Sequence, residues 1–332
     1  MSQIIHFAIV GFGHIGKRHA STILANKNCK LISICDSDKI AYFQNKDFEN
    51  VPFYEDIATM LAQQPSVEVV CICTPSGFHA QQALLILDAK KHVVCEKPMA
   101  LSRVGCEAMI LKAMQVGRQI FGVMQNRFSP ISIWLKKIVT ENILGELFFV
   151  QINCFWNRDD RYYLADNQLH TWHGNKELDG GTLFTQFSHF VDMLFWLFGD
   201  VKNIQSKLVN FSHQHSIDFE DSGFVNFDFV KKGIGTLQYS TSVWDKNLES
   251  SLTIIGSKGS IKVGGQYMER LEYCHVENYT PPVFEKINST NNHVFVIQNV
   301  VEVLQGNEFA STNAVEGMKV VDIIERIYQS NR

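Results

Sequence analysis

The amino-acid sequence predicts an α/β protein with two domains. A doubly wound parallel sheet is expected over residues 1–124, and an α+β region with a largely antiparallel sheet over residues 125–332. With 332 residues the chain is long enough for two ordinary domains. Its first half alternates nearly continuous apolar strands with helical patterns, which is typical of a buried parallel sheet. Its second half shows polar–apolar alternation and hairpin signals, which favour antiparallel or mixed pairing.

The elements of the first half follow one another without a long linker. Strands are expected at 6–10, 30–36, 67–75, 92–98 and 119–126, and helices after the first glycines and at 56–63, 77–91 and 101–117. In an open parallel sheet, ligands bind beyond the carboxyl ends of the strands. Residues that follow strands should therefore share one edge and contribute cofactor contacts, among them Thr74, Pro75, Glu96, Lys97 and Gln125.

A glycine motif joins the first strand to the first helix. Gly11, Gly13 and Gly16 have the spacing G-x-G-x-x-G within "HFAIVGFGHIGKRHASTIL", and the next strand ends in Asp36. A preceding strand, a following helix and an acidic residue about 20 positions further on indicate a dinucleotide-binding turn. The glycines would let the backbone approach a pyrophosphate at the helix N-terminus. The alternative, a plain tight turn followed by a solvated aspartate, would not require this context.

The same region predicts which dinucleotide is bound. Asp36 would accept hydrogen bonds from the adenosine ribose hydroxyls and repel a 2′-phosphate, and no arginine follows it in "CDSDKI". NAD is therefore favoured over NADP. The predicted cofactor contacts here are Gly11, Phe12, Gly13, His14, Ile15, Gly16, Asp36 and Ser37.

The second half is expected to form a sheet. Its predicted elements are strands at 145–156 and 201–211, hairpins at 222–243 and 251–265, and late helices at 291–306 and 313–330. The last helix is expected to pack back on the first domain.

A single helix, expected over residues 181–198, interrupts these strands. It is apolar except at positions spaced by three or four, namely Thr182, Thr185 or Gln186, His189 and Asp192. This spacing places a polar stripe on one helical face, while the other face can pack on the sheet. A lone histidine in such a helix is more often a satisfied core residue. Because several polar groups share this face, we expect it to line a site.

Composition narrows the class of protein. The net charge is −4 and no polybasic run occurs, so neither nucleic acid nor an anionic membrane is an expected partner. The polar stripe in the apolar 181–198 segment speaks against a membrane span. The N-terminus has no basic segment leading into a long apolar run, so no signal peptide is expected.

The eight cysteines form no C-x-x-C pair, and Cys71 and Cys73 lie in an apolar strand. We therefore expect no metal site, and free buried thiols in a reducing, cytoplasmic compartment.

These motifs together resemble the glucose–fructose oxidoreductase and inositol dehydrogenase family. The glycine motif with Asp36, "TPSGFH" at 74–79, "CEKP" at 95–98 and the later "GG" before His189 carry the resemblance, which covers essentially the whole chain. It implies a Rossmann domain followed by a domain with an open-faced sheet, and assembly into dimers or tetramers through those sheets. His79, which ends the second of these motifs, joins the predicted cofactor contacts.

The resemblance also implies catalytic roles. In that family the lysine of Glu-Lys-Pro lies beside the nicotinamide and the substrate hydroxyl, and a histidine of the second domain faces it. Carried over, these are Lys97 and His189. Lys97 would take the hydroxyl proton. This requires that its pKa lie below the value of about 10.4 that an exposed lysine has. Glu96 is assigned a structural or cofactor-positioning role, and Asp192 would orient His189 or bond the backbone.

Three longer stretches are similar to a subgroup, the UDP-N-acetylglucosaminuronic acid 3-dehydrogenases, which serve surface-polysaccharide synthesis: "QNRFSP", "FWNRDDRYY" and "WHGNKELDGGTLFTQFSH". The chain departs from its relatives at His173, where many have arginine. It departs again at Thr185, where the wider family often has aspartate and this subgroup asparagine. Both positions concern the substrate. The substrate contacts implied are Lys97, Arg127, Arg158, Tyr162, Tyr163, Trp172, His173, Thr185, Gln186 and His189.

The sequence therefore predicts an NAD-dependent oxidation of a nucleotide-sugar hydroxyl. Arginines suit the uronate carboxylate or the diphosphate of such a substrate, although solvated arginines and packed tyrosines remain the alternative. Some relatives reoxidise their NADH with 2-oxoglutarate. Two other functions stay open: a dehydrogenase of a free polyol or sugar such as myo-inositol, and a non-catalytic NAD-binding regulator. Lys97 and His189 argue against the regulator, which would not need them.

Overall fold

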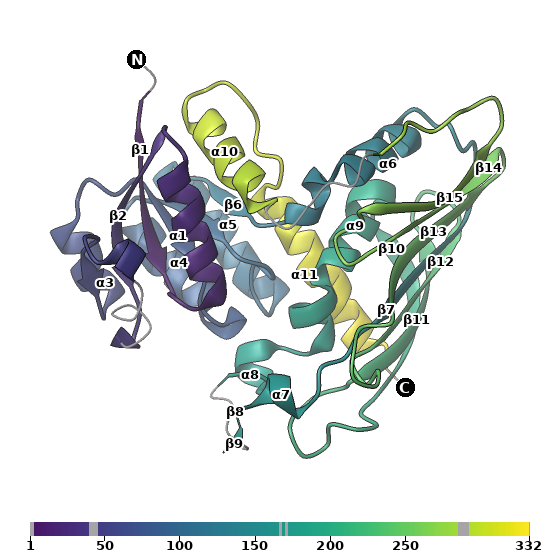
Figure 1. Cartoon of the computed structure of the whole chain (residues 1–332), viewed down its shortest axis with the longest axis horizontal. Coiled ribbons are helices and arrows are strands. Elements are labelled where there is room, and N and C mark those ends of the chain that lie inside the picture. Colours follow the sequence, from purple (N-terminus) through teal and green to yellow (C-terminus); the bar gives the residue numbers. More distant parts are fainter. Residues whose placement is uncertain (1–2, 40–45, 166–167, 170–171, 285–291, 332) are drawn as a thin grey trace. The chain divides into compact units, whose positions relative to one another are not determined.

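The computed structural model describes residues 3–39, 46–165, 168–169, 172–284 and 292–331 (Figure 1). The chain divides into two compact units. Unit 1 comprises Met1–Met124 and His293–Met318, and unit 2 comprises Gln125–Asn292 and Lys319–Arg332. Across the described ranges, no helix is both long and apolar enough to cross a membrane.

In the described part of unit 1, six strands form one sheet in the order β3-β2-β1-β4-β5-β6. Every neighbouring pair is parallel. The strands are β1 (Ile5–Val10), β2 (Cys29–Cys35), β3 (Phe53–Tyr54), β4 (Val69–Ile72), β5 (His92–Cys95) and β6 (Ile120–Gly122). The order reverses at β1, so the predicted doubly wound sheet is confirmed. All four residues of β4 are buried, which explains its unbroken apolar run.

The helices of unit 1 cover the sheet in pairs. α1 (His14–Ala25) packs against α10 (His293–Leu304), and α4 (His79–Asp88) packs against α5 (Arg103–Val116). α3 (Ile57–Gln63) and the short 3-10 turns η1 (Lys46–Phe48) and η2 (Ser76–Phe78) complete the described helices. Local sequence sets their ends. At the start of α5 the Ser102 hydroxyl accepts the N–H of Gly105, and Gly117 ends the helix with φ +64°.

Unit 2 contains a mixed sheet, whose seven described strands follow the order β10-β11-β12-β7-β13-β14-β15. Only the pair of β12 with β7 is parallel among these strands. They are β7 (Leu147–Phe155), β10 (Val201–Val209), β11 (Ser222–Phe229), β12 (Ile234–Ser240), β13 (Glu249–Gly256), β14 (Gly259–Gly264) and β15 (Arg270–Val276). Both predicted hairpins are confirmed, β11 with β12 and β13 with β14. A separate ribbon joins β8 (Leu164–Ala165) to β9 (Gln168–Leu169).

The predicted interrupting helix is present, but it is not regular. It consists of a π-helix, η4 (Leu183–Phe187), followed by α9 (Ser188–Phe198). Its aromatic side chains pack on the sheet: the ring centroids of Phe187 and Tyr239 are 5.5 Å apart, and those of Phe198 and Phe229 are 5.4 Å apart.

Further helices accompany it in unit 2, so the expectation of a single interrupting helix is wrong. They are α7 (Asp160–Tyr163) and α8 (Lys176–Asp179), which lie between β7 and η4, while η3 (Gln125–Phe128) and α6 (Pro130–Thr140) precede β7. The final helix α11 (Ala314–Gln329), which begins in unit 1 and ends in unit 2, confirms the late helix predicted over 313–330. α7 and α8 have only four residues each, which is too short for a periodic pattern to reveal.

Candidate active site

The glycine turn between β1 and α1 is closely packed. Gly11 has φ +88°, and a Cβ at this position would lie 2.6 Å from the main-chain carbon of Cys73. A Cβ on Gly16 would lie 2.0 Å from the carbonyl oxygen of Gly11. No side chain caps α1 at Gly13 in the described structure, which leaves its first N–H groups to an anion. The turn therefore fits the pyrophosphate of a dinucleotide.

Asp36 follows β2 and contacts the same turn. Its Oδ2 accepts the N–H of Phe12, and its Oδ1 accepts the N–H of Asp38 at 2.8 Å. The half-buried carboxylate thus holds the glycine turn beside the end of β2, with Ser37 exposed next to it. Its contact with an adenosine ribose stays a prediction.

His79 links two strand-end turns. Its Nε2 lies 2.9 Å from the carbonyl oxygen of Thr74, and its Nδ1 lies 2.8 Å from that of Pro98. Burial lowers the pKa of His79, and a neutral imidazole donates from one nitrogen only. His79 therefore fastens the turn after β4 to the turn that carries Lys97. This is a structural position, and the cofactor contact of His79 stays a prediction.

Lys97 follows β5, is half-buried, and precedes Pro98 through a cis peptide bond. The neighbouring Glu96 is buried, and its Oε1 lies 2.8 Å from Nε2 of His19 on α1. The expected structural role of Glu96 thus has a concrete partner. Sequence reasoning missed His19, although its place three residues after Gly16 on the inner face of a helix was an available signal.

In unit 2, His189 of α9 and Gln125 of η3 are brought together. Their side-chain nitrogens Nε2 are 3.0 Å apart, and both side chains are buried. If the Gln125 amide donates, Nε2 of the imidazole is the acceptor and its Nδ1 carries the proton. Gln125, which was predicted to contact the cofactor, and His189, which was predicted to be catalytic, are therefore in contact within unit 2. Lys97 belongs to unit 1.

Arg127 and Asp192 form a buried bidentate ion pair. Nε of Arg127 donates to Oδ2 of Asp192 at 2.9 Å, and Nη2 donates to Oδ1 at 2.6 Å. Sequence reasoning missed this pairing, which differs from both roles suggested for Asp192. Because Asp192 neutralises its charge and occupies two of its N–H donors, Arg127 would attract a substrate anion more weakly. The substrate role predicted for Arg127 is therefore weakened by its partner.

Arg158 has different surroundings. Its guanidinium lies over the rings of Trp156 and Tyr162, at 4.8 and 5.2 Å from their centroids. Nε donates to Oε1 of Gln186 at 2.8 Å, and the Gln186 amide donates to the Tyr162 hydroxyl at 2.8 Å. Among the described residues, no carboxylate pairs with Arg158. Burial lowers its pKa, which reflects a cation withdrawn from water without a counter-ion.

The segment before α8 places further predicted site residues next to Tyr162. The ring centroids of His173 and Tyr162 are 4.4 Å apart, and those of His173 and Trp172 are 3.5 Å apart. Tyr163 is buried and its ring lies 5.4 Å from that of His213. His173 thus lies between Trp172 and Tyr162, the ring on which the Arg158 guanidinium rests, whereas Tyr163 packs in the interior beside His213.

Thr185 of η4 is hydrogen-bonded to Asp179, the last residue of α8. Its hydroxyl donates to the carboxylate and the carbonyl oxygen of Asp179. The other carboxylate oxygen of Asp179 accepts the N–H of Gly174 at 2.8 Å. Asp179 is buried and was not singled out from the sequence. Thr185 and Asp179 therefore position the segment that carries His173.

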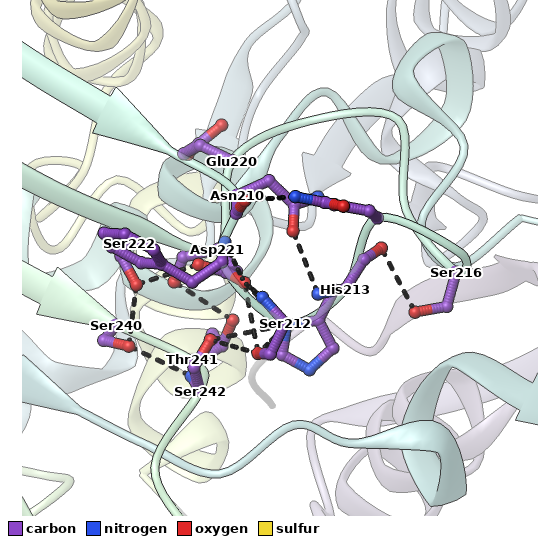
Figure 2. A network of polar contacts seen from close by, with 12 residues as sticks. Asn210, Ser212, His213, Ser216, Glu220, Asp221, Ser222, Ser240, Thr241 and Ser242 are labelled. Atoms are coloured by element: carbon purple, nitrogen blue, oxygen red, sulfur yellow. Dashed lines mark hydrogen bonds and ion pairs between the residues drawn. The ribbon is translucent and has the colours of Figure 1, made fainter.

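A polar network joins the loop before β11 to the start of β11 and the end of β12 (Figure 2). Asp221 accepts the N–H of Ser212 at 2.8 Å and lies 3.0 Å from Nδ1 of His213. The same loop reaches Gly174, whose carbonyl oxygen accepts the N–H of Asp218 at 3.0 Å. Oγ of Ser212 lies 3.2 Å from the same Nδ1 that faces Asp221, so this is not the geometry of a nucleophilic triad.

Another buried carboxyl supports the beginning of η4. Oε1 of Glu220 accepts the hydroxyls of Tyr239 at 2.9 Å and Tyr328 at 2.7 Å. The Tyr328 hydroxyl in turn accepts the N–H of Leu183 at 3.3 Å. Burial raises the pKa of Glu220 to about 7. Sequence reasoning missed all of these groups.

Two family profiles match the chain. One, described as "Oxidoreductase family, NAD-binding Rossmann fold", matches residues 5–123. The other, described as "GFO/IDH/MocA C-terminal domain", matches residues 133–262.

Individual proteins are similar over nearly the whole chain. The WlbA dehydrogenase from Bordetella pertussis, solved with NADH and UDP-GlcNAcA, is 30% identical with a TM-score of 0.89, and the match covers 99% of this chain and 96% of that one. The WlbA dehydrogenase from Chromobacterium violaceum, solved with the same ligands, is 30% identical with a TM-score of 0.91, covering 99% and 94%. The D-glucoside 3-dehydrogenase of Escherichia coli is 25% identical over 349 residues, covering 99% of this chain and 96% of the relative.

Proposed function

The chain belongs to the Gfo/Idh/MocA family of NAD-binding oxidoreductases, and on this premise we propose that it oxidises the 3-hydroxyl of UDP-N-acetylglucosaminuronic acid. Bound NAD supplies the hydride acceptor. Lys97 accepts the proton of the 3-hydroxyl as the hydride leaves C3, and the products are a 3-keto sugar and NADH. His189 holds the reacting oxygen by a hydrogen bond, and the Gln125 amide sets its tautomer.

The surroundings of Arg158 carry the choice of an anionic substrate. This guanidinium lies on the rings of Trp156 and Tyr162, and no described carboxylate neutralises it. Arg127, in contrast, is already paired with Asp192. An unpaired cation away from water is costly, and a uronate carboxylate or a diphosphate would supply its counter-charge. The similarity to two dehydrogenases solved with UDP-GlcNAcA supports the same substrate.

A neutral sugar is the second candidate. The D-glucoside 3-dehydrogenase of Escherichia coli is similar over 99% of this chain. His173, standing where many relatives have arginine, removes one cation from the substrate side. A free sugar or polyol such as myo-inositol is therefore the competing substrate class.

The physiological setting belongs to the same proposal. All eight cysteines are free, which supports a reducing cytoplasmic compartment. Alternate residues of β7 are buried and half-exposed, so one sheet face has surface left for a second copy in a dimer or tetramer. 2-Oxoglutarate is the proposed reoxidant of NADH that stays bound.

The substrate is tested with three compounds. The purified enzyme is incubated separately with UDP-N-acetylglucosaminuronic acid, UDP-N-acetylglucosamine and myo-inositol, with and without 2-oxoglutarate. Keto-sugar formation is followed by mass spectrometry, because retained NADH would hide a steady-state absorbance signal. We expect turnover of the uronate. Turnover of myo-inositol but of neither UDP sugar would contradict the proposed substrate and leave only the family-level function.

The proposed base is tested by Lys97→Met. This variant should bind NAD normally and lose about a hundredfold or more in rate, as expected when a general base is removed. Lys90→Met, at an exposed position before β5, is the matched control and should keep its rate. Near-normal turnover by the Lys97→Met variant would show that another group takes the proton.

A further inference from the structure

Two histidines meet the carboxylate that precedes Lys97. Nε2 of His19 lies 2.8 Å from Oε1 of Glu96, within hydrogen-bond distance, and Nε2 of His293 lies 3.6 Å from the same oxygen. The two imidazole rings contact each other edge to face, with centroids 5.3 Å apart. All three side chains are buried in unit 1.

The cluster joins segments far apart in the sequence. His19 lies on α1, whose N-terminus follows the glycine turn, and His293 is the first residue of α10. The second carboxylate oxygen, Oε2 of Glu96, accepts the main-chain N–H of Lys97 at 3.1 Å. One carboxylate thus connects both helices to the backbone of Lys97.

The electrostatic state of the cluster is also defined. Burial would raise the pKa of Glu96, yet its contacts with His19 and His293 hold that pKa well below the ordinary range. Burial lowers the pKa of His293. A charged carboxylate away from water needs donors on its oxygens, and here they come from an imidazole and from the Lys97 N–H.

We propose that His19 and His293 are positioning residues for Lys97: they hold the Glu96 carboxylate in place, and through it the Lys97 main chain. Without the His19 donor and the neighbouring His293 imidazole, the carboxylate would rotate toward another partner or take up a proton. Either change would weaken its bond to the Lys97 N–H and loosen the turn after β5. The link to catalysis rests on the proposed role of Lys97 as the base.

A metal ion is the competing occupant of this cluster, because two imidazoles and a carboxylate are common zinc ligands and their donor atoms lie within 4.8 Å of one another. The geometry favours hydrogen bonding. A distance of 2.8 Å between His19 Nε2 and Glu96 Oε1 is that of a direct hydrogen bond. Two ligands each about 2.0 Å from a tetrahedral zinc ion would lie more than 3 Å apart.

The test measures hydrogen exchange of the Lys97 amide in the full chain, residue by residue, without any substrate. His19→Leu removes the donor to Glu96, and the double variant His19→Leu/His293→Leu also removes the second imidazole. His19→Gln keeps a donor, because a glutamine amide nitrogen can stand near the place of Nε2. His92→Leu is the matched control: it removes an imidazole from the same strand, where His92 accepts the N–H of Gln119 rather than contacting Glu96.

We expect Lys97 protection to fall about tenfold or more in the two leucine variants, and to stay within about twofold in His19→Gln and His92→Leu. Turnover should follow the same order, while KM for NAD changes little. Unchanged Lys97 protection in the double variant would overturn the proposal. So would one equivalent of tightly bound metal whose removal by a chelator abolishes protection in the unaltered protein. Absent sugar turnover would refute the proposed function alone, since exchange is read without substrate.

Discussion

The buried carboxyl of Glu220 makes the stability of this protein depend on pH. Burial raises its pKa from 4.5 to about 7, although the hydroxyls of Tyr239 and Tyr328 donate to Oε1 and partly offset this effect. The folded protein therefore holds this proton more tightly than the unfolded chain does. Below pH 4.5 both states are protonated, and the contribution to stability is complete. As pH rises through about 7, the folded state must also release the proton, and the contribution is lost.

The magnitude follows from the two pKa values. The difference between about 7 and 4.5, at about 1.4 kcal/mol for each pH unit, amounts to about 3 kcal/mol of unfolding free energy. Glu220→Gln removes the titration but keeps an oxygen that can accept both tyrosine hydroxyls. The variant should match the unaltered protein near pH 5 and exceed its stability by about 2–3 kcal/mol at pH 8.

Urea unfolding at pH 5, 6, 7 and 8, followed by circular dichroism, measures this difference. Glu277→Gln, at an exposed carboxylate on the same unit, is the control and should show no such trend. If the Glu220→Gln variant and the unaltered protein lose stability in parallel across this range, the carboxyl does not titrate where its surroundings imply.

Three further predictions concern the ligands and the arginines. Asp36→Ala should narrow the preference for NAD over NADP by about tenfold or more, because a hydrogen bond to a charged group contributes about 1.5–3 kcal/mol. Equal use of both cofactors by the unaltered enzyme would refute the role of Asp36. Arg127→Met should cost about 3–5 kcal/mol of stability in urea unfolding, because it leaves Asp192 buried without its partner. Arg158→Met should change stability far less and raise KM for the UDP-uronate by about tenfold or more, and the reverse pattern between the two arginines would contradict their assignment.

Much of the fold could be predicted because its signals are local. The solid apolar run of β4 and the glycine turn at Gly11 each report a backbone environment within a few residues. The parallel pairing of β12 with β7 could not be predicted, because the paired residues Leu237 and Ile152 are 85 positions apart in the sequence (237 − 152).

The candidate site divides in the same way. Lys97, His189 and Arg158 could be proposed as site residues because they stand in short motifs that resemble those of a known family. Their partners could not, because Asp179, Glu220 and the histidines around Glu96 acquire a role only through tertiary contacts. His293, for example, lies about 200 positions after Glu96 and reads as the plain start of an amphipathic helix.

The π-turn of η4 has a consequence for how the polar side chains of this helix are aimed. In a regular α-helix each residue advances the direction of the side chains by about 100°. The wider turn at Leu183–Phe187 absorbs about one extra residue, so groups before and after it no longer share one line. Thr185 is directed to Asp179 and Gln186 to Tyr162, while His189 is directed to Gln125. Deleting one residue within η4 would restore a straight helix of nearly the same composition and buried area, yet rotate the upstream groups against the downstream ones. One additional residue in η4 thus distinguishes a helix that only packs from one that directs three side chains to three different partners.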